Sequence, residues 1–417
     1  MTFAGRFTRF VRGSTRLVLE GKGLYWGWVA FLGALIASGV AAYADQLSAG
    51  LAVTSMRDPV SWGFYIGNFT FLVGVAAAAV VLVIPAYVYD WKPIREIVIF
   101  GELLAVSAIV MCMLFVMVDV GHPERFWHLI PPWGRLNLPR SILAWDSVVL
   151  TAYLAVNFVV VTHILYRAFC GRPYEKRLVV PLVLLSIPMA VGIHTVTAFL
   201  YNGLAARPYW NSSILAPQFL ASAFCSGPAI LLVVLQLLRR FTRFEIQDEA
   251  IWKVAELMAY AMFLNLFLHG AEAFKEYYSA TEHLLFTRYW FEGIGEHRTL
   301  VPYAWTAVVL NVAAFVLFIV PAARRNWVTL NLGCLATYAG CYIEKGMGLI
   351  VPGLTPDTLG EIYEYFPSMT ELRVAAGVFA IGFLAFTLML KVAVPISLGE
   401  FQDGSERPAT VGVRSGS

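Results

Sequence analysis

Apolar segments of about 20 residues recur along nearly the whole chain, and they restrict the fold more than any other feature of the sequence. A helix of that length spans the hydrocarbon core of a bilayer. The segments are continuous and do not alternate between apolar and polar residues, which excludes a transmembrane β-barrel. Of the 417 residues, 59% are apolar and only 14% are charged, too few charges to cover a soluble domain of this size. The sequence therefore predicts an all-α, polytopic membrane protein.

Ten transmembrane helices are expected, in the ranges 24–44, 62–86, 97–119, 143–166, 178–201, 215–238, 252–273, 302–322, 328–350 and 373–396. They divide the chain into a basic N-terminal segment, 1–23, a membrane domain, 24–396, and a tail, 397–417, that we expect to be disordered. The N-terminal segment has no short apolar core followed by a small-residue cleavage site. We therefore expect no removable signal peptide.

The distribution of basic residues predicts the orientation of the chain. Ten spans put both termini on one side, and that side has 20 of the 30 Lys and Arg residues. By the positive-inside rule, both termini are predicted to be cytoplasmic in a multi-pass protein of the inner membrane. The longer connections 120–142, 274–301 and 351–372 then face outward. The net charge of +3 reflects this topology and does not indicate a nucleic-acid partner.

The cysteines and membrane histidines argue against a resident metal centre. The five cysteines are scattered, without a CxxC, a CxxCH or a ferredoxin-like spacing, so we expect no iron–sulfur cluster, no covalent haem and no other metal in this chain. A b-type haem needs two facing axial ligands. The histidines within predicted spans are His163, His194 and His269, and no two of them lie at one depth in one bundle. Haem b is the less favoured alternative.

A weak internal repeat predicts two parallel four-helix bundles. "LAWDSVVLT" at 143–151 resembles "YAWTAVVLN" at 303–311, and "GELLA" at 101–105 resembles "AELMA" at 255–259. The repeat aligns Asp146 with Thr306, Glu102 with Glu256, and His194 with Glu344. Spans 2–5 (62–201) and 6–9 (215–350) would form the two bundles, flanked by spans 1 and 10.

Polar and aromatic residues are predicted to converge on the outer third of the first bundle. Ionisable groups inside a membrane are costly and indicate a functional site. Simpler explanations also exist, because Asp119 and Arg125 could pair at the interface and the tryptophans could form an aromatic belt. The residues at this level are Tyr65, Asn68, Asp119, His122, Arg125, Trp145, Asp146 and His194.

This set of side chains suits a quinone. A quinone enters from lipid, forms hydrogen bonds at two carbonyl oxygens and exchanges two protons. A histidine or tyrosine at one oxygen, an aspartate or asparagine at the other, aromatic walls and a nearby carboxylate meet those needs. We therefore expect His194, Asp146 and Asp119 to take part in the chemistry.

Several stretches resemble the NrfD/PsrC family of membrane subunits, which exchange electrons between quinone and an iron–sulfur partner. They are "SWGFYIGNFTFLVGVAAAA" (61–79), "VDVGHPERFWH" (118–128), "AWDSVV" (144–149) and "IPMAVGIHTVTAFLYNGLAARPYWN" (187–211). Within the family, the ten-span length and "HTVTAFLY" are most similar to the DsrP-type subunits of dissimilatory sulfur metabolism. Many members have Arg at the position of His122.

The resemblance implies a site for menaquinone or ubiquinone on the outer side of the first bundle, and no haem in this subunit. Its matching positions are Tyr65, Asn68, Asp119, Arg125, Asp146 and His194. It also implies a docked ferredoxin-like iron–sulfur subunit on the outer face, with further membrane and cytochrome subunits. The chain would then be a subunit of a quinone oxidoreductase complex rather than a complete enzyme.

A second set of polar residues suggests proton routes, and with them proton translocation. In the first bundle a path could run through Glu102, Asn157 and His194 toward Asp146. Interfacial carboxylates or an internal hydrogen-bonded network would explain the same residues without proton movement. The candidate proton-path residues in the second bundle are Glu256, His269, Glu272 and Glu344.

Two other functions stay open at this stage. A cofactor-free membrane anchor for a redox complex would need no quinone site. A proton-coupled transporter would also suit a parallel repeat with buried carboxylates, although transporters favour broken helices around a midplane site.

Overall fold

The computed structural model describes residues 3–403, which form helices joined by turns and loops. Within that range no β-strand forms, and one isolated bridge pairs Ile294 with His297. The predicted all-α class is thus confirmed. Of the tail that we expected to be disordered, 397–417, the part from 404 onward lies outside the described residues.

Nine helices in the described part of the chain are long and apolar enough to cross a membrane. One of them is formed by α3 and α4 together with the π-helical turn Ile84–Val88. The nine are α2 (Gly23–Ala49), α3 and α4 (Phe64–Ala76 and Ala78–Val83), α6 (Val98–Asp119), α7 (Ile142–Phe169), α8 (Lys176–Asn202), α9 (Leu215–Phe241), α10 (Asp248–Ser279), α12 (Val301–Ile319) and α16 (Met369–Ser397). The remaining helices are α1 (Phe3–Leu19), α5 (Lys92–Arg95), α11 (His283–Phe291), α13 (Pro321–Arg324), α14 (Trp327–Lys345) and α15 (Met347–Leu354).

The predicted span 328–350 is the exception among the ten. Its residues belong to α14 and α15, which are separated at Gly346. With Asn331, Glu344 and Lys345 among its 19 residues, α14 is not one of the nine apolar helices. A multi-pass membrane protein is supported, whereas the number of ten spans stays a prediction.

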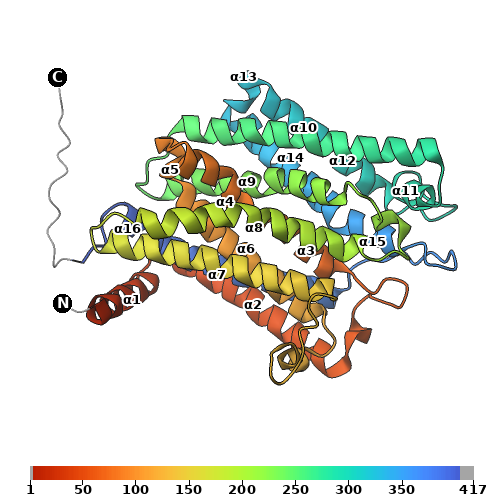
Figure 1. The fold of residues 1–417 in the computed structure, drawn as a ribbon, viewed down its shortest axis with the longest axis horizontal. Helices are drawn as coiled ribbons and strands as arrows, with labels where there is room; N and C mark the ends of the chain where they lie inside the picture. The colour runs from red at the N-terminus through yellow and green to blue at the C-terminus, as the bar shows by residue number, and fades with distance from the viewer. Residues whose placement is uncertain (1–2, 404–417) are drawn as a thin grey trace.

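The same order of helix contacts occurs twice along the chain. In a first group, α3 and α7 each contact both α6 and α8. In a second group, α9 and α12 each contact both α10 and α14. α9 also packs against α3, α4 and α8 and so joins the second group to the first. Figure 1 shows the long helices running side by side. The axis that would relate the two groups stays a prediction.

Burial separates central helices from peripheral ones. Most side chains of α3 and α6 are buried, including Phe71 and Phe115. α2 exposes large apolar side chains, including Trp28 and Phe31. Exposed apolar faces of this kind fit a lipid environment and would be unfavourable in water.

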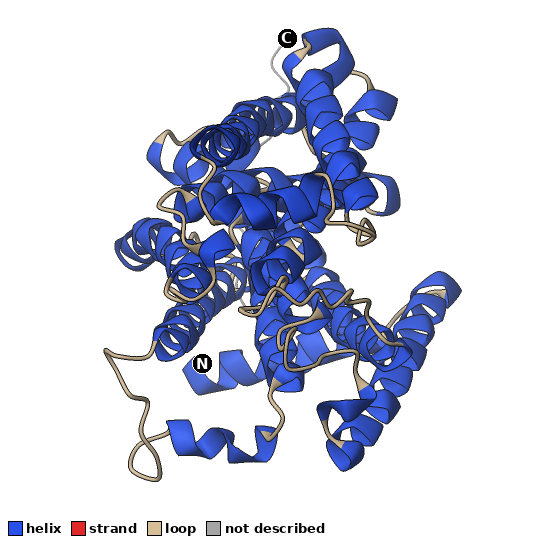
Figure 2. Ribbon diagram, turned by 90° about the vertical axis from the view of Figure 1, so that its right-hand side faces the viewer, coloured by secondary structure: helices blue, strands red, loops and turns tan. Residues whose placement is uncertain are grey.

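The three long connections that the sequence predicts to face outward lie at one end of the helices. Figure 1 shows this end on the right, and Figure 2 looks directly onto it. α1 lies at the opposite end, where Phe10 packs against Phe169 with ring centroids 5.4 Å apart. The side of the membrane that each end faces stays a prediction.

At the loop-bearing end, the buried carboxylate of Glu371 joins the connection before α3 to the connection before α16. Its Oε2 accepts hydrogen bonds from the amides of Ser55 and Ser368, each at 2.8 Å. Its Oε1 accepts a hydrogen bond from the hydroxyl of Tyr365, and that hydroxyl accepts one from the amide of Phe64 at 2.8 Å. Burial and the neighbouring Glu371 carboxylate raise the pKa of Tyr365 well above its ordinary value. These bonds hold the start of α3 against the start of α16.

We predict that Gly39→Leu will lower the unfolding temperature of the protein in detergent. α2 and α16 meet at Gly39, where a β-carbon would lie 2.7 Å from the Cα of Gly377. Forcing a side chain into such a contact costs about 1–3 kcal/mol. Gly33→Leu is the matched control, because Gly33 lies on the same helix with no atom within 4 Å of its β-carbon position. Equal unfolding temperatures for the two variants would contradict a tight α2–α16 contact.

Candidate functional site

Asp146 and Thr197 join α7 to α8 inside the first group. Asp146 is buried, and its Oδ1 accepts a hydrogen bond from the Thr197 hydroxyl at 2.6 Å. A carboxylate can accept several hydrogen bonds, and no other bond to this one is present among the described residues. Asp146 therefore keeps acceptor capacity in an apolar interior.

His194 lies one turn before Thr197 on α8 and is completely buried. Its Nδ1 is 2.6 Å from the carbonyl oxygen of Ala190, so Nδ1 is the nitrogen that donates a hydrogen. Its Nε2 is also buried and has no hydrogen-bond partner among the described residues. Unpartnered buried polar atoms are rare, and Nε2 is available for a ligand.

Asp119 provides a second unpartnered atom. It ends α6, and its Oδ1 is buried without a hydrogen-bond partner in the described part of the chain. Asp119 interacts electrostatically with Tyr65, whose hydroxyl donates to the Oε1 of Gln46 at 2.7 Å. Gln46 in turn donates to the carbonyl of Val118 at 2.7 Å. These bonds fix the position of Tyr65 beside the end of α6.

Aromatic rings pack together around Tyr201 of α8. Tyr201 interacts electrostatically with both Asp146 and Asp119. Its ring lies 5.7 Å from Trp62 and 5.2 Å from Trp210, measured between centroids. Tyr201 and Trp210 are buried members of the site that residue-by-residue reasoning missed, although both fall in the quoted stretch 187–211.

Asn68 connects the first group to the second. Its side-chain nitrogen donates to the carbonyl of Phe64 at 2.7 Å, and its Oδ1 accepts from the Tyr342 hydroxyl of α14 at 2.7 Å. Both ends of the amide are therefore engaged. Tyr342 was not among the predicted site residues.

The predicted loop residues lie outside this buried cluster. The side chains of His122 and Arg125 are mostly exposed, and both face Glu124, at 2.9 and 3.9 Å. A backbone hydrogen bond and the His122 ring lower the pKa of Glu124. Arg125 thus pairs with Glu124, whereas the sequence suggested a pair with Asp119. Trp145 is partly exposed and donates to the carbonyl of Pro139 at 3.0 Å.

The repeat-equivalent carboxylates Glu102 and Glu256 have different surroundings. Glu102 is buried, its Oε2 has no hydrogen-bond partner among the described residues, and it interacts electrostatically with Tyr153. Asn157 donates to the carbonyl of Tyr153 at 2.8 Å. Glu256 is partly exposed and lies 3.6 Å from Arg324. Glu102 is thus a buried carboxylate with one unpartnered oxygen, whereas Glu256 is paired near the surface, and a proton path through either stays a prediction.

The second group contains its own polar network. Glu344 accepts a hydrogen bond from Asn311 at 2.7 Å and pairs with the Nε2 of His269. The Nδ1 of His269 is 2.9 Å from the carbonyl of Asn265. Glu272 lies nearby and accepts from Gln218 at 2.6 Å. The predicted set His269, Glu272 and Glu344 thus converges, whereas Gln218 and Asn311 were not predicted.

This network borders a cavity of about 90 Å³ near the loop-bearing end. Tyr209, Trp290 and Phe291 form aromatic walls. The cavity also includes Glu276, which is 3% exposed and whose Oε2 has no hydrogen-bond partner among the described residues. A polar cavity of this volume has room for several water molecules.

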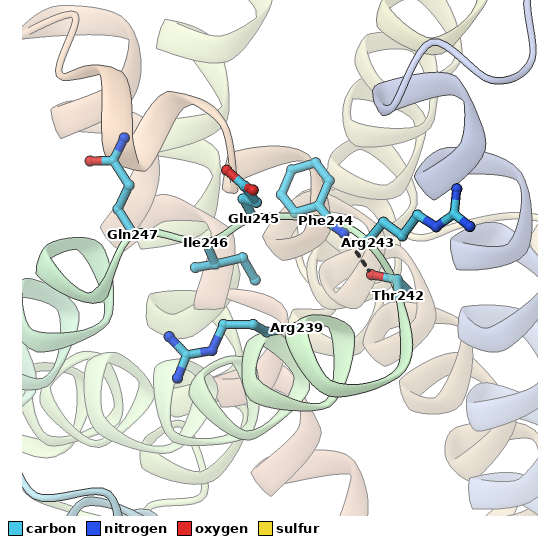
Figure 3. Close-up of a pocket in the computed structure, with 7 residues that line it drawn as sticks. All are labelled: Arg239, Thr242, Arg243, Phe244, Glu245, Ile246 and Gln247. Atoms are coloured by element: carbon cyan, nitrogen blue, oxygen red, sulfur yellow. Dashed lines mark hydrogen bonds between the residues drawn. The ribbon is translucent and has the colours of Figure 1, made fainter.

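A larger cavity, of about 390 Å³, lies at the opposite end, along the connection between α9 and α10 (Figure 3). It is lined by Arg239 and residues 242–247. Within it the Thr242 hydroxyl accepts a hydrogen bond from the Phe244 amide, and Arg239 stacks over the ring of Trp327 at 4.3 Å. Buried acids and histidines are absent from its lining, so its size does not make it the reactive site.

We predict that Thr197→Val will lower the unfolding temperature in detergent, because it leaves the buried Asp146 without its hydrogen bond. A loss of this kind costs about 1–3 kcal/mol. Thr195→Val on the same helix is the control, since the Thr195 hydroxyl bonds to the Val191 carbonyl of its own helix. Equal stability of the two variants would show that the Asp146–Thr197 bond does not hold α7 to α8.

Relatives with curated names match almost the whole chain. The chain is 26% identical to a putative dimethyl sulfoxide reductase membrane subunit of Halobacterium salinarum, over 86% of this chain and 88% of the relative. It is 22% identical to a selenate reductase subunit of Mesobacillus selenatarsenatis, over 90% and 94%. It is 24% identical to the Hdr-like menaquinol oxidoreductase integral membrane subunit of Archaeoglobus fulgidus, over 90% and 94%.

A protein family matches most of the chain as well. The match to the family described as "Polysulphide reductase, NrfD" covers residues 52–355. That range runs from the connection before α3 through α15 and includes the buried Asp146 and His194 and the partly buried Asp119 of the site described above. The chain belongs to the NrfD family of polysulphide reductase membrane subunits.

Proposed function

We propose that this protein is the quinone-interacting membrane subunit of a respiratory redox complex. The observation that carries the proposal is the pair of buried, unpartnered atoms His194 Nε2 and Asp119 Oδ1, in a cluster with aromatic walls. The names of the three relatives describe subunits of reductases or of a menaquinol oxidoreductase, which agrees with this role.

The residues of the first group fit a quinone headgroup. His194 Nε2 and Asp119 Oδ1 would accept hydrogen bonds from the two hydroxyls of the quinol, with Trp62, Tyr201 and Trp210 as apolar walls. A bound quinol supplies two electrons and two protons when it is oxidised. His194 and Asp146 would receive the protons, because both have free acceptor capacity beside the site. Tyr65 and Asn68 would position neighbouring groups through their hydrogen bonds.

His122, Arg125 and Trp145 would have a different role. Their exposure places them where a partner protein or a lipid tail could contact them. We propose that they form the rim of the entrance rather than the floor of the site. The quinone, whether menaquinone or ubiquinone, would enter from lipid.

The electrons would pass to an iron–sulfur subunit docked at the loop-bearing end. The three long connections meet there, and exposed aromatic side chains such as Phe126, Trp127 and Trp133 are available for contact. We place this end outside the cytoplasm, with both termini inside, as the distribution of basic residues favours. Further cytochrome and membrane subunits, and a DsrP-type role in dissimilatory sulfur metabolism, are part of the proposal.

Proton movement is the next part of the proposal. Glu102, Tyr153 and Asn157 extend from the inner part of α6 into α7 and would carry protons toward His194. The network of His269, Glu272 and Glu344 and its cavity would exchange protons with the outer face. The two matched sets of helix contacts support two four-helix bundles, 62–201 and 215–350, within ten spans.

We predict that the purified complex will contain extractable quinone and that two site variants will oxidise quinol slowly. His194→Ala removes a ligand group, and losing one hydrogen bond of about 1–3 kcal/mol corresponds to roughly a 5- to 150-fold decrease in affinity or turnover. Asp146→Asn keeps the shape but removes a proton acceptor, so it should decrease turnover more than quinone binding. The measurements are quinol oxidation and retained quinone, with the amount of each subunit determined on the same sample.

Matched controls separate the site from general damage. His163→Ala changes a histidine near the other end of α7, whose Nε2 accepts only a weak bond from the Glu175 amide at 3.4 Å. Asp45→Asn changes an exposed acid. Both controls should keep wild-type turnover. Wild-type turnover in His194→Ala and Asp146→Asn as well, or a complex without quinone, would favour a cofactor-free anchor.

We predict that a photo-crosslinker at Trp133 will capture the iron–sulfur subunit in the assembled complex. Trp133 is 70% exposed in the connection 120–142. The control position is Phe241, which is 68% exposed but lies at the other end of α9 from the site. Capture from Phe241 and not from Trp133 would place the partner on the opposite face.

A further inference from the structure

The last two turns of α14 present polar groups to both groups of helices. Tyr342 donates to Asn68 of α3 at 2.7 Å, and its ring packs edge-on against Phe71. Glu344 accepts from Asn311 of α12 at 2.7 Å. One short stretch of helix therefore contacts the proposed quinone site on one side and the second polar network on the other.

Lys345, the last residue of α14, is turned toward the first group. It is 5% exposed, and its Nζ donates to the carbonyl of Phe219 at 2.9 Å and lies 4.5 Å from the centre of the Phe219 ring. A β-carbon on Gly74 of α3 would lie 3.2 Å from this Nζ. The amino group is thus enclosed between α3 and α9.

No carboxylate of the described residues forms an ion pair with this amino group. Among the described residues, the lysines that form ion pairs are Lys92, Lys253 and Lys275, and all three are partly or mostly exposed. The hydrogen-bond acceptor of Lys345 is a backbone carbonyl. A cation buried in an apolar interior without a paired counter-charge is unfavourable, and within a membrane it indicates a functional site.

Lys345 lies beside the aromatic wall of the site in the first group. Phe219, whose carbonyl accepts the hydrogen bond from Lys345, packs against Tyr201 of α8 with ring centroids 5.9 Å apart. Tyr201 follows the unpartnered His194 by two turns on the same helix. Lys345 therefore approaches the site of the first group from α14 of the second group.

We propose that Lys345 is a positioning residue of the quinone site that provides a positive charge opposite the bound headgroup. A quinol oxygen that has given up its proton but not yet its electrons carries negative charge, and a nearby positive charge stabilises it. Lys345 itself takes no part in the electron transfer. The inference rests on the proposed function. It means that residues from both groups of helices contribute to the quinone site.

The test compares Lys345→Met with Lys345→Arg in the assembled complex. We expect the methionine variant to assemble without loss of thermal stability and to oxidise quinol roughly 10- to 100-fold more slowly, as for loss of one charge-assisted contact. The decrease should appear in kcat rather than KM. The reduction potential of the bound quinone should become more negative in the methionine variant. Lys345→Arg, which keeps the charge, should retain most of the wild-type rate of quinol oxidation and most of the wild-type reduction potential.

The control is Lys391→Met, because Lys391 also lies over an aromatic ring, that of Tyr25 at 5.0 Å, but near the other end of α16. Lys391→Met should leave the rate of quinol oxidation and the reduction potential of the bound quinone unchanged. If the methionine variant does not assemble, Lys345→Gln takes its place, since glutamine can keep the bond to Phe219 without the charge.

The outcomes distinguish this inference from the proposed function. Wild-type rate and potential in Lys345→Met or Lys345→Gln, with His194→Ala impaired, would overturn the role of Lys345 alone. Wild-type rates in His194→Ala and Asp146→Asn as well would overturn the proposed function. Loss of thermal stability that arginine does not repair would show that Lys345 only supports packing, which also overturns the inference.

Discussion

The structure depends on one constraint, which is that polar groups inside an apolar assembly have no water to bind. Several interior hydroxyls meet it locally, by bonding to a carbonyl about one turn earlier, as Ser222 does to Phe219 and Ser226 does to Ser222. Such bonds hold nothing together between helices. The few bonds that cross between helices, such as Thr197 to Asp146 and Tyr342 to Asn68, therefore determine which helices must meet and in which register.

The same constraint identifies the places where pairing is incomplete. A polar atom without a partner destabilises the interior, so it persists only where something else requires it. In the first group these atoms include His194 Nε2, Asp119 Oδ1 and Glu102 Oε2. They follow the bundle from its inner part to the loop-bearing end. The cavity at the connection between α9 and α10 has no such atoms in its lining, which is why unpartnered groups locate the site better than cavity volume does.

The fold was largely predictable from the sequence, whereas the site was predictable only in part. Hydropathy suffices for the long helices, because each must be apolar over the membrane thickness. Asp146 and His194 were found because ionisable residues within spans are conspicuous. Thr197 was missed because a threonine within a span usually bonds to its own helix. Tyr342 was missed because its partner Asn68 is 274 positions away, a separation that no local pattern encodes.

The break between α14 and α15 explains why Lys345 was overlooked and why it matters. At the end of a continuous span, a lysine would extend its amino group into the interface. Instead α14 ends at Gly346 inside the protein, close to α3, where a β-carbon on Gly67 would lie 3.4 Å from the Gly346 backbone. The end of a helix carries partial negative charge, which helps to hold a cation at that depth. A helix end buried against α3 can thus place a positive charge beside the site of the first group, while Glu344, one residue earlier, belongs to the network of the second.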